Sequence, residues 1–145
     1  MNIAVILAGG SGTRLGNDIP KQFLKVAGKK VLEHTIEVFE NAKNIDEICI
    51  VSRIDCINDV ESIVVNNGYL KVKKILAGGK ERYDSSLAAI HAYPNGNHNL
   101  LFHDAVRPLL TERIINDCLS ALEKYNAVDV AIKTTDTIIP AMPKK

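Results

Sequence analysis

Apolar stretches typical of buried strands alternate with segments of helical periodicity along most of the chain. The strand-like stretches lie at 2–8, 46–52, 71–77, 98–104 and 127–133, and the helical ones at 31–42, 56–68, 83–93 and 111–125. A strand, a helix and a further strand in succession are typical of a parallel sheet with helices packed on its faces. The order therefore predicts an α/β fold, a three-layer α/β/α sandwich with a mostly parallel sheet.

Composition narrows the class of protein. The chain has 145 residues, which suits a single domain over 1–145, and 18 basic residues nearly balance 17 acidic ones. This balance argues against a nucleic-acid partner bound through bulk charge. No apolar run approaches the about 18 residues of a membrane span, so no membrane partner is expected. The three cysteines form no CxxC pair, which favours buried thiols and a cytoplasmic location.

The stretch after the first strand reads LAGGSGTRLGNDIPKQF and is rich in glycine. Bare N–H groups in such a loop form a concavity that binds anions, and glycine lets a ligand approach the main chain. Arg14 and Lys21 add the positive charge that a polyphosphate requires. The candidate nucleotide-binding residues of this stretch are Leu7, Ala8, Gly9, Gly10, Gly12 and Thr13.

Two common phosphate-binding loops fit this stretch poorly. A GxxxxGK[ST] loop is absent. The dinucleotide fingerprint GxGxxG begins at Gly10 but has Leu15 in place of its last glycine. Ser52 and Arg53 stand where that fingerprint expects an acidic residue at the end of the second strand. An NADP-binding domain is therefore the weakest alternative.

Two further loops follow predicted strands and carry polar residues. AGGKERYDSSLAAI places a glycine turn before a helix that begins near Arg82, with Ser85 in its first turn. Such a helix start offers N–H groups and hydroxyls to a planar base. FHDAVRPLLT places Asp104 at the end of a strand, where a carboxylate could hold magnesium against phosphate oxygens. His103 lies within the strand and is interpreted as a structural residue.

The loop with PKQF resembles the nucleotide loop of nucleotidyltransferases that activate sugar and alditol phosphates. It is most similar to the cytidylyltransferase branch, which includes the enzymes for ribitol 5-phosphate and 2-C-methyl-D-erythritol 4-phosphate. GGKERYDS and HDAVRP also resemble motifs of this family, and TTDTII carries its DT pair. The resemblance implies a Rossmann-like fold of the nucleotidyltransferase type.

The resemblance also implies roles for individual residues. Arg14 and Lys21 would be catalytic, and Gly79, Lys80, Ser85, Asp104 and Ala105 would join the first loop in binding CTP. Arg107 and Thr137 would lie on the side of the accepting substrate. Asp104 would meet the metal, a magnesium ion (Mg²⁺).

The implied reaction transfers a cytidylyl group from CTP to a small alditol phosphate and releases pyrophosphate. AGG, KQF and HDAVRP favour ribitol 5-phosphate as the acceptor. The alternatives are 2-C-methyl-D-erythritol 4-phosphate, the acceptor in isoprenoid synthesis, and a CTP-binding remnant without catalysis.

Members of the family continue beyond the last motif found here. The resemblance implies a homodimer built by a C-terminal β-arm, together with further basic and metal-side residues. This chain ends at Lys145, before these features. We therefore expect a C-terminally truncated member of the family, which is monomeric or poorly defined in its oligomeric state without the arm.

Overall fold

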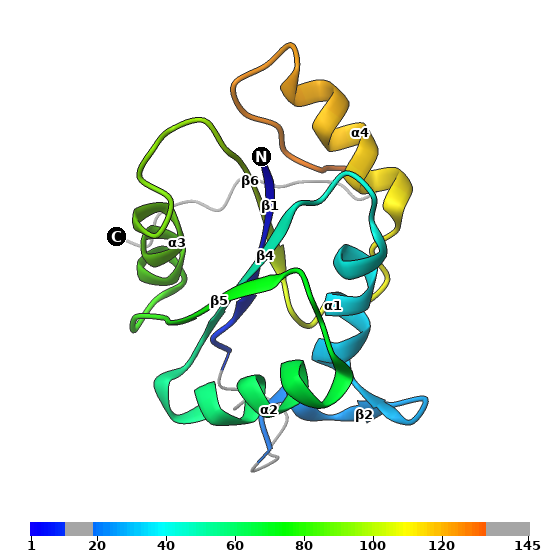
Figure 1. Cartoon of the computed structure of the whole chain (residues 1–145), viewed down its shortest axis with the longest axis vertical. Coiled ribbons are helices and arrows are strands. Elements are labelled where there is room, and N and C mark those ends of the chain that lie inside the picture. Colours follow the sequence, from blue (N-terminus) through cyan, green and yellow to red (C-terminus); the bar gives the residue numbers. More distant parts are fainter. Residues whose placement is uncertain (11–18, 133–145) are drawn as a thin grey trace, which may run out of the picture.

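The computed structural model describes residues 1–10 and 19–132. Its centre is a four-stranded parallel sheet in the order β5-β4-β1-β6 (Figure 1). The strands are β1 (Asn2–Ala8), β4 (Glu47–Ser52), β5 (Val72–Ala77) and β6 (Asn99–Asp104). The parallel sheet predicted from the β-α alternation is confirmed, and β5 lies at an edge of the described sheet.

The register of the strands brings their carboxyl ends to one edge of the sheet. Ala8 at the end of β1 pairs with Ser52 of β4, and Leu7 pairs with Asp104 of β6. Ser52 in turn pairs with Ala77 at the end of β5. Loops that follow these strands consequently start side by side, although they are far apart in the sequence.

Helices cover both faces of the sheet. They are α1 (Val31–Asn41), α2 (Ile57–Asn67), α3 (Arg82–His91) and α4 (Glu112–Leu122). Figure 1 shows α3 apart from the other three helices, on the opposite side of the sheet. The three-layer α/β/α sandwich predicted from the sequence is thus confirmed.

In the described part of the chain, the core consists of two clusters, one on each face of the sheet, because successive strand residues point to opposite faces. Ile6 and Ile50 point toward α1, α2 and α4, where Leu32, Phe39 and Ile115 are fully or almost fully buried. Val5, Cys49 and Val51 point the other way and pack against Ala89 of α3. The larger cluster lies on the side with three helices.

Local signals in the sequence fix several boundaries. Gly68 ends α2 with a φ of 65°, a left-handed conformation that glycine adopts at little cost. The helix predicted to begin near Arg82 does begin there. Thr111 is the residue before α4, and its carbonyl oxygen accepts hydrogen bonds from Ile114 and Ile115 at 3.1 and 3.3 Å.

Short elements carry the chain between β1 and α1 and between β4 and α2. They are η2 (Lys21–Phe23), β2 (Lys25–Val26), β3 (Lys29–Lys30) and η3 (Ile54–Cys56), of which β2 and β3 form an antiparallel pair.

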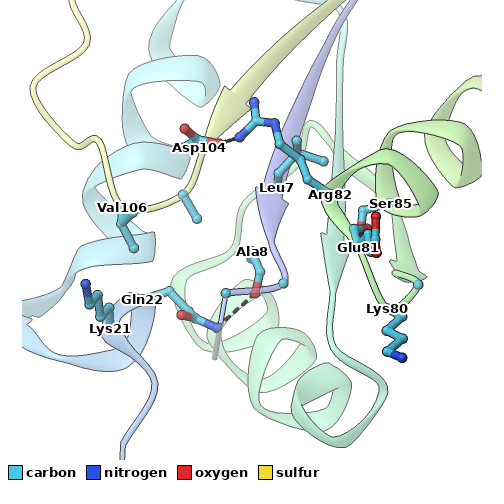
Figure 2. Close-up of a pocket in the computed structure, with 14 residues that line it drawn as sticks. Leu7, Ala8, Lys21, Gln22, Lys80, Glu81, Arg82, Ser85, Asp104 and Val106 are labelled. Atoms are coloured by element: carbon cyan, nitrogen blue, oxygen red, sulfur yellow. Dashed lines mark hydrogen bonds and ion pairs between the residues drawn. The ribbon is translucent and has the colours of Figure 1, made fainter. Parts of the chain in front are cut away.

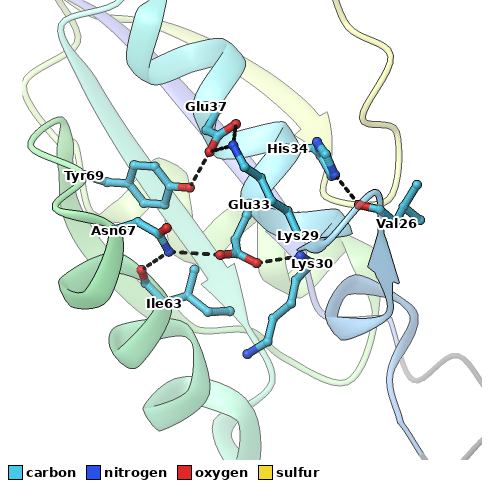
Figure 3. A network of polar contacts seen from close by, with 9 residues as sticks. All are labelled: Val26, Lys29, Lys30, Glu33, His34, Glu37, Ile63, Asn67 and Tyr69. Atoms are coloured by element: carbon cyan, nitrogen blue, oxygen red, sulfur yellow. Dashed lines mark hydrogen bonds and ion pairs between the residues drawn. The ribbon is translucent and has the colours of Figure 1, made fainter.

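The β2–β3 hairpin is bound to α1 by the polar network of Figure 3. Lys29 Nζ pairs with Glu37 at 2.6 Å, and His34 Nε2 donates to the Val26 carbonyl oxygen at 2.8 Å. Glu33 accepts from the Lys30 backbone N–H at 2.5 Å and from Asn67 of α2 at 3.0 Å. The hairpin that follows Lys21 is therefore fixed on α1, whose Glu33 is held in turn by Asn67 of α2.

The strand predicted at 127–133 is a wrong prediction over its described part. Residues 127–132 belong to no strand, and Val130 and Ile132 are 62% and 95% exposed. The alternation of apolar and polar residues is typical of a half-buried strand, but a strand is stable only where its backbone pairs with a neighbour. Within the described ranges this segment has no such neighbour.

The sequence favours buried thiols for the three cysteines. The expectation is confirmed for Cys49 and Cys56, which are buried, and is wrong for Cys118, which is partly exposed at the surface of α4. No helix in the described part of the chain has the length and apolar character to cross a membrane.

Candidate active site

A cavity of about 410 Å³ opens at the carboxyl edge of the sheet (Figure 2). Four segments meet there: the end of β1, the start of η2, the loop before α3 with its first turn, and the turn after β6. Its lining consists of Leu7, Ala8, Gly9, Gly10, Lys21, Gln22, Gly79, Lys80, Glu81, Arg82, Ser85, Asp104, Ala105 and Val106. Ligands bind at this edge in open α/β sheets, so the cavity is the candidate site.

The end of β1 is joined to η2 by one buried hydrogen bond. Gln22 is only 1% exposed, and its Nε2 donates to the Ala8 carbonyl oxygen at 2.9 Å. Pro20 precedes η2, and its carbonyl oxygen accepts from the Phe23 N–H at 2.9 Å. Lys21 is thus presented to the cavity by a short helical turn that the Gln22 side chain anchors to the end of β1.

The loop after β5 approaches α3 so closely that two of its positions require glycine. A Cβ atom at Gly78 would lie 2.5 Å from Ser85 Oγ, and one at Gly79 would lie 2.1 Å from the Cβ of Asp84. The Gly78 N–H also donates to the Ser52 carbonyl oxygen at 2.7 Å. The glycine pair therefore lets the loop pack between the sheet and the first turn of α3.

Ser85 and Lys80 contribute to the cavity in different ways. Ser85 is 6% exposed, and its hydroxyl donates to the Glu81 carbonyl oxygen at 3.4 Å, a long bond within the helix. Lys80 lies in the exposed loop, and Figure 2 shows its side chain directed away from Asp104. Lys21 and Lys80 lie on opposite sides of the end of β1 in this view.

Several hydrogen bonds hold the turn after β6, including the one from the Arg107 N–H to the Asp104 carbonyl oxygen at 3.1 Å. The Ala105 N–H donates to the Leu7 carbonyl oxygen at 3.0 Å, and Thr35 Oγ1 donates to the Ala105 carbonyl oxygen at 2.8 Å. His103 Nε2 donates to the Arg107 carbonyl oxygen at 2.9 Å, and its ring packs edge-on against Phe39. These contacts give His103 a structural role, in agreement with its omission from the predicted site.

The carboxylate of Asp104 forms ion pairs with two arginines at the site. Its Oδ1 accepts a hydrogen bond from Arg82 Nη1, and its Oδ2 lies 3.0 Å from Arg107 Nε. The carboxylate is mostly buried, with 19% of its side chain exposed, whereas the two guanidinium groups extend toward solvent. One carboxylate is therefore shared by two arginines.

The donor set suits a magnesium ion only in part. No three histidine, cysteine or acidic side chains of the described residues gather to hold a metal. Magnesium commonly binds one or two carboxylates together with phosphate oxygens and water. Asp104 could hold the ion in this manner when a nucleotide supplies the remaining oxygens.

The structure brings most of the predicted residues to one cavity. Ten of the residues assigned to nucleotide, metal or catalysis line it: Leu7, Ala8, Gly9, Gly10, Lys21, Gly79, Lys80, Ser85, Asp104 and Ala105. Arg107 is outside its lining but pairs with Asp104. Gly12, Thr13, Arg14 and Thr137 fall outside the described residues.

Sequence reasoning missed four residues that line the cavity, namely Gln22, Glu81, Arg82 and Val106. Gln22 lies within the quoted PKQF motif, but nothing in its pattern indicates a buried amide. From its sequence context, Arg82 is interpreted as a structural anchor of the loop rather than a site residue. Its ion pair with Asp104 joins residues 22 positions apart, which only the fold brings together.

The fold and the cavity together define an α/β protein whose ligand site combines exposed glycine backbone with basic side chains. The profile of the family "IspD: 2-C-methyl-D-erythritol 4-phosphate cytidylyltransferase" matches residues 2–144. The chain therefore belongs to this cytidylyltransferase family, as the loop motifs had indicated.

Individual relatives agree with this assignment. The chain is 53% identical over 140 residues to the bifunctional ribulose 5-phosphate reductase/CDP-ribitol pyrophosphorylase Bcs1 of Haemophilus influenzae. It is 39% identical over 138 residues to 2-C-methyl-D-erythritol 4-phosphate cytidylyltransferase of Thermobifida fusca. The crystal structure of 4-diphosphocytidyl-2C-methyl-D-erythritol synthase from Anaerococcus prevotii superposes with a TM-score of 0.79 at 31% identity.

Coverage differs between this chain and the proteins it matches. The three alignments cover 95%, 94% and 95% of this chain. They cover 30% of the Haemophilus protein, 55% of the Thermobifida protein and 57% of the Anaerococcus chain. The chain thus spans between about a third and somewhat over half of their lengths.

Proposed function

We propose that this chain binds CTP together with Mg²⁺ and forms the nucleotide half of a site that transfers a cytidylyl group to an alditol phosphate. The observation that carries the proposal is the meeting of four separate segments in one cavity. The cavity is lined by the backbone of Gly9 and Gly10, the cation Lys21, the first turn of α3 and the carboxylate of Asp104. A triphosphate, a base and a metal ion would each find suitable groups there.

The chemistry of the proposed reaction needs no general base. A phosphomonoester oxygen of the acceptor attacks the α-phosphorus of CTP, a new P–O bond forms, and the bond to the β-phosphate breaks to release pyrophosphate. Because that oxygen is already ionised near neutral pH, the protein contributes positioning and electrostatic stabilisation. Lys21, together with Arg14, is proposed to stabilise the charge that grows on the α-phosphate oxygens.

Asp104 is proposed to hold Mg²⁺ when the nucleotide is bound. The ion would neutralise phosphate charge and favour departure of pyrophosphate. The loop with Gly79, Lys80 and Ser85 is proposed to contact the cytosine, and Ala105 to lie against the ribose. Arg107 and Thr137 are assigned to the acceptor side.

Ribitol 5-phosphate is the acceptor we favour. The motifs AGG, KQF and HDAVRP support it, and so does the 53% identity to a relative whose name includes CDP-ribitol pyrophosphorylase. The second candidate is 2-C-methyl-D-erythritol 4-phosphate, named in the matching family and in the relative from Thermobifida fusca.

Calorimetric titration with CTP and Mg²⁺ tests the nucleotide half of the proposal. ATP, UTP and NADPH serve as controls. Selective binding of CTP supports a cytidine site, whereas binding of NADPH alone contradicts the proposal and supports a dinucleotide-binding domain.

Release of pyrophosphate tests the catalytic half. The chain is incubated with CTP, Mg²⁺ and each of the two acceptors in turn. Faster release with ribitol 5-phosphate supports the favoured acceptor, and faster release with the other reverses the preference. Binding of CTP without any release would indicate a binding protein rather than an enzyme.

A further inference from the structure

Asp104 is proposed as a metal ligand, yet both of its carboxylate oxygens already have cationic partners. Arg82 Nη1 donates to Oδ1, and Arg107 Nε lies 3.0 Å from Oδ2. The Asp104 side chain is only 19% exposed, so a metal ion has limited access to it past these groups. A dication placed on this carboxylate would also stand next to two guanidinium charges, which repel it.

The two arginines are not equivalent in their position. Arg107 lies three residues after Asp104 in the same turn, so their pairing is local. Arg82 is the first residue of α3 and directly follows the loop on the other side of the cavity. Figure 2 shows its side chain reaching across the cavity edge to Asp104. The Arg82–Asp104 pair is thus a bridge between two walls of the site.

We propose that Arg82 is a resident counter-cation on Asp104, which Mg²⁺ displaces when it enters with the nucleotide, and that the displaced guanidinium then contacts a phosphate oxygen. This inference rests on the proposed function. The exchange keeps every charge paired: the carboxylate passes from arginine to metal, and the arginine passes from carboxylate to phosphate. No covalent bond changes.

The exposure of Arg82 makes such an exchange feasible. Its side chain is 65% exposed, and ion pairs with an exposed partner contribute little to stability, so separation of the pair costs little. A guanidinium also binds phosphate well, often through two parallel hydrogen bonds. Arg82 begins α3, directly after the loop with Gly79 and Lys80 that is proposed to contact the cytosine. Release of Arg82 from Asp104 would therefore couple metal binding to this loop.

The test compares wild type with Arg82→Gln in two binding measurements. The first is the affinity of the nucleotide-free chain for Mn²⁺, followed by water-proton relaxation. We expect Arg82→Gln to bind Mn²⁺ about two- to fivefold more tightly, the effect of one exposed charge pair. The second is the affinity for CTP with Mg²⁺ by calorimetry, which we expect to fall about tenfold, as for a lost charge-assisted contact. A purely structural role for Arg82 would weaken both.

Three further variants make the result specific. Arg82→Lys keeps a cation and should keep the Mn²⁺ affinity of wild type. Asp104→Asn combined with Arg82→Gln should bind Mn²⁺ no better than Asp104→Asn alone. Arg113→Gln removes an arginine from the exposed Arg113–Asp117 pair on α4 and should change neither affinity. Thermal unfolding establishes that each variant is folded.

The outcomes separate this inference from the proposed function. Unchanged or weaker Mn²⁺ binding in Arg82→Gln would overturn the inference. A gain in Mn²⁺ affinity that persists when Asp104→Asn is also present would overturn it too. So would an unchanged affinity of Arg82→Gln for CTP with Mg²⁺. Failure of wild type to bind CTP would reject the proposed function, while the Mn²⁺ measurement would still report on the Arg82–Asp104 pair.

Discussion

Gln22 donates a hydrogen bond from its Nε2 to the carbonyl oxygen of Ala8, 2.9 Å away and 14 residues earlier in the chain. The bond is buried, and it joins the last residue of β1 to the segment that carries Lys21. It therefore determines how the proposed catalytic lysine is placed relative to the backbone of Gly9 and Gly10.

Replacement of Gln22 by leucine should reduce both stability and CTP binding. A buried carbonyl group left without its partner costs about 1–3 kcal/mol, and the segment with Lys21 loses its anchor. Urea unfolding measures the first effect and calorimetry with CTP the second. Ser62→Ala is the matched control, because it removes a hydrogen bond of 2.8 Å at an exposed position of α2. This control should stay within about 0.5 kcal/mol of wild type. Equal effects of the two variants would argue against an anchoring role.

Lys21→Ala should impair function far more than folding. Loss of one well-placed charge contact to the transition state typically lowers the rate on the order of 10²–10³-fold. Release of pyrophosphate from CTP with an alditol phosphate measures this rate, and thermal unfolding measures stability. Lys25→Ala, at an exposed position of β2, is the control and should change neither. Undiminished turnover in Lys21→Ala would exclude this lysine from the mechanism.

Gly79→Ala should lower stability, whereas Gly10→Ala should retain stability and lower the affinity for CTP. The Cβ of Gly79→Ala would lie 2.1 Å from the Asp84 Cβ, so the loop must shift, at a cost of about 1–3 kcal/mol. Among the described residues, apart from its chain neighbours, no atom lies within 4 Å of the Cβ at position 10, so Gly10→Ala should retain stability. Its methyl group should nevertheless lower the affinity for CTP, because it covers the backbone that the nucleotide approaches. A stable Gly10→Ala with unchanged CTP affinity would contradict the proposed nucleotide path.

The thiol of Cys49 should react only at strongly alkaline pH. Burial raises its pKa from about 9 to about 11, while the nearby Lys74 opposes the shift only in part. We therefore expect thiol reagents at pH 8 to modify the partly exposed Cys118 well before Cys49. Mass spectrometry of the alkylated protein identifies the modified residue.

The same shift affects stability. Because the folded-state pKa of Cys49 lies above the unfolded value, its contribution to stability is complete below about pH 9 and is lost as the pH rises toward about 11. The loss of stability between these values should be smaller in Cys49→Ala than in wild type. Equal losses would show that the Cys49 thiol has the same pKa in the folded and the unfolded state.

The sequence predicted the four parallel strands and the four helices of the described part of the chain. It failed at 127–132, where Val128, Val130 and Ile132 alternate with polar or small residues, as in a half-buried strand. Periodicity reports whether a segment could form a strand, but pairing depends on a neighbouring backbone, which periodicity does not encode.

The sequence by itself determined the order of strands and helices and the types of residue at the strand ends, since both follow from local periodicity and from glycine and proline positions. Only the tertiary structure decided how those ends meet. The Gln22–Ala8 hydrogen bond and the Arg82–Asp104 ion pair depend on strand register and helix placement. These are long-range packing relationships, which arise when the whole core forms.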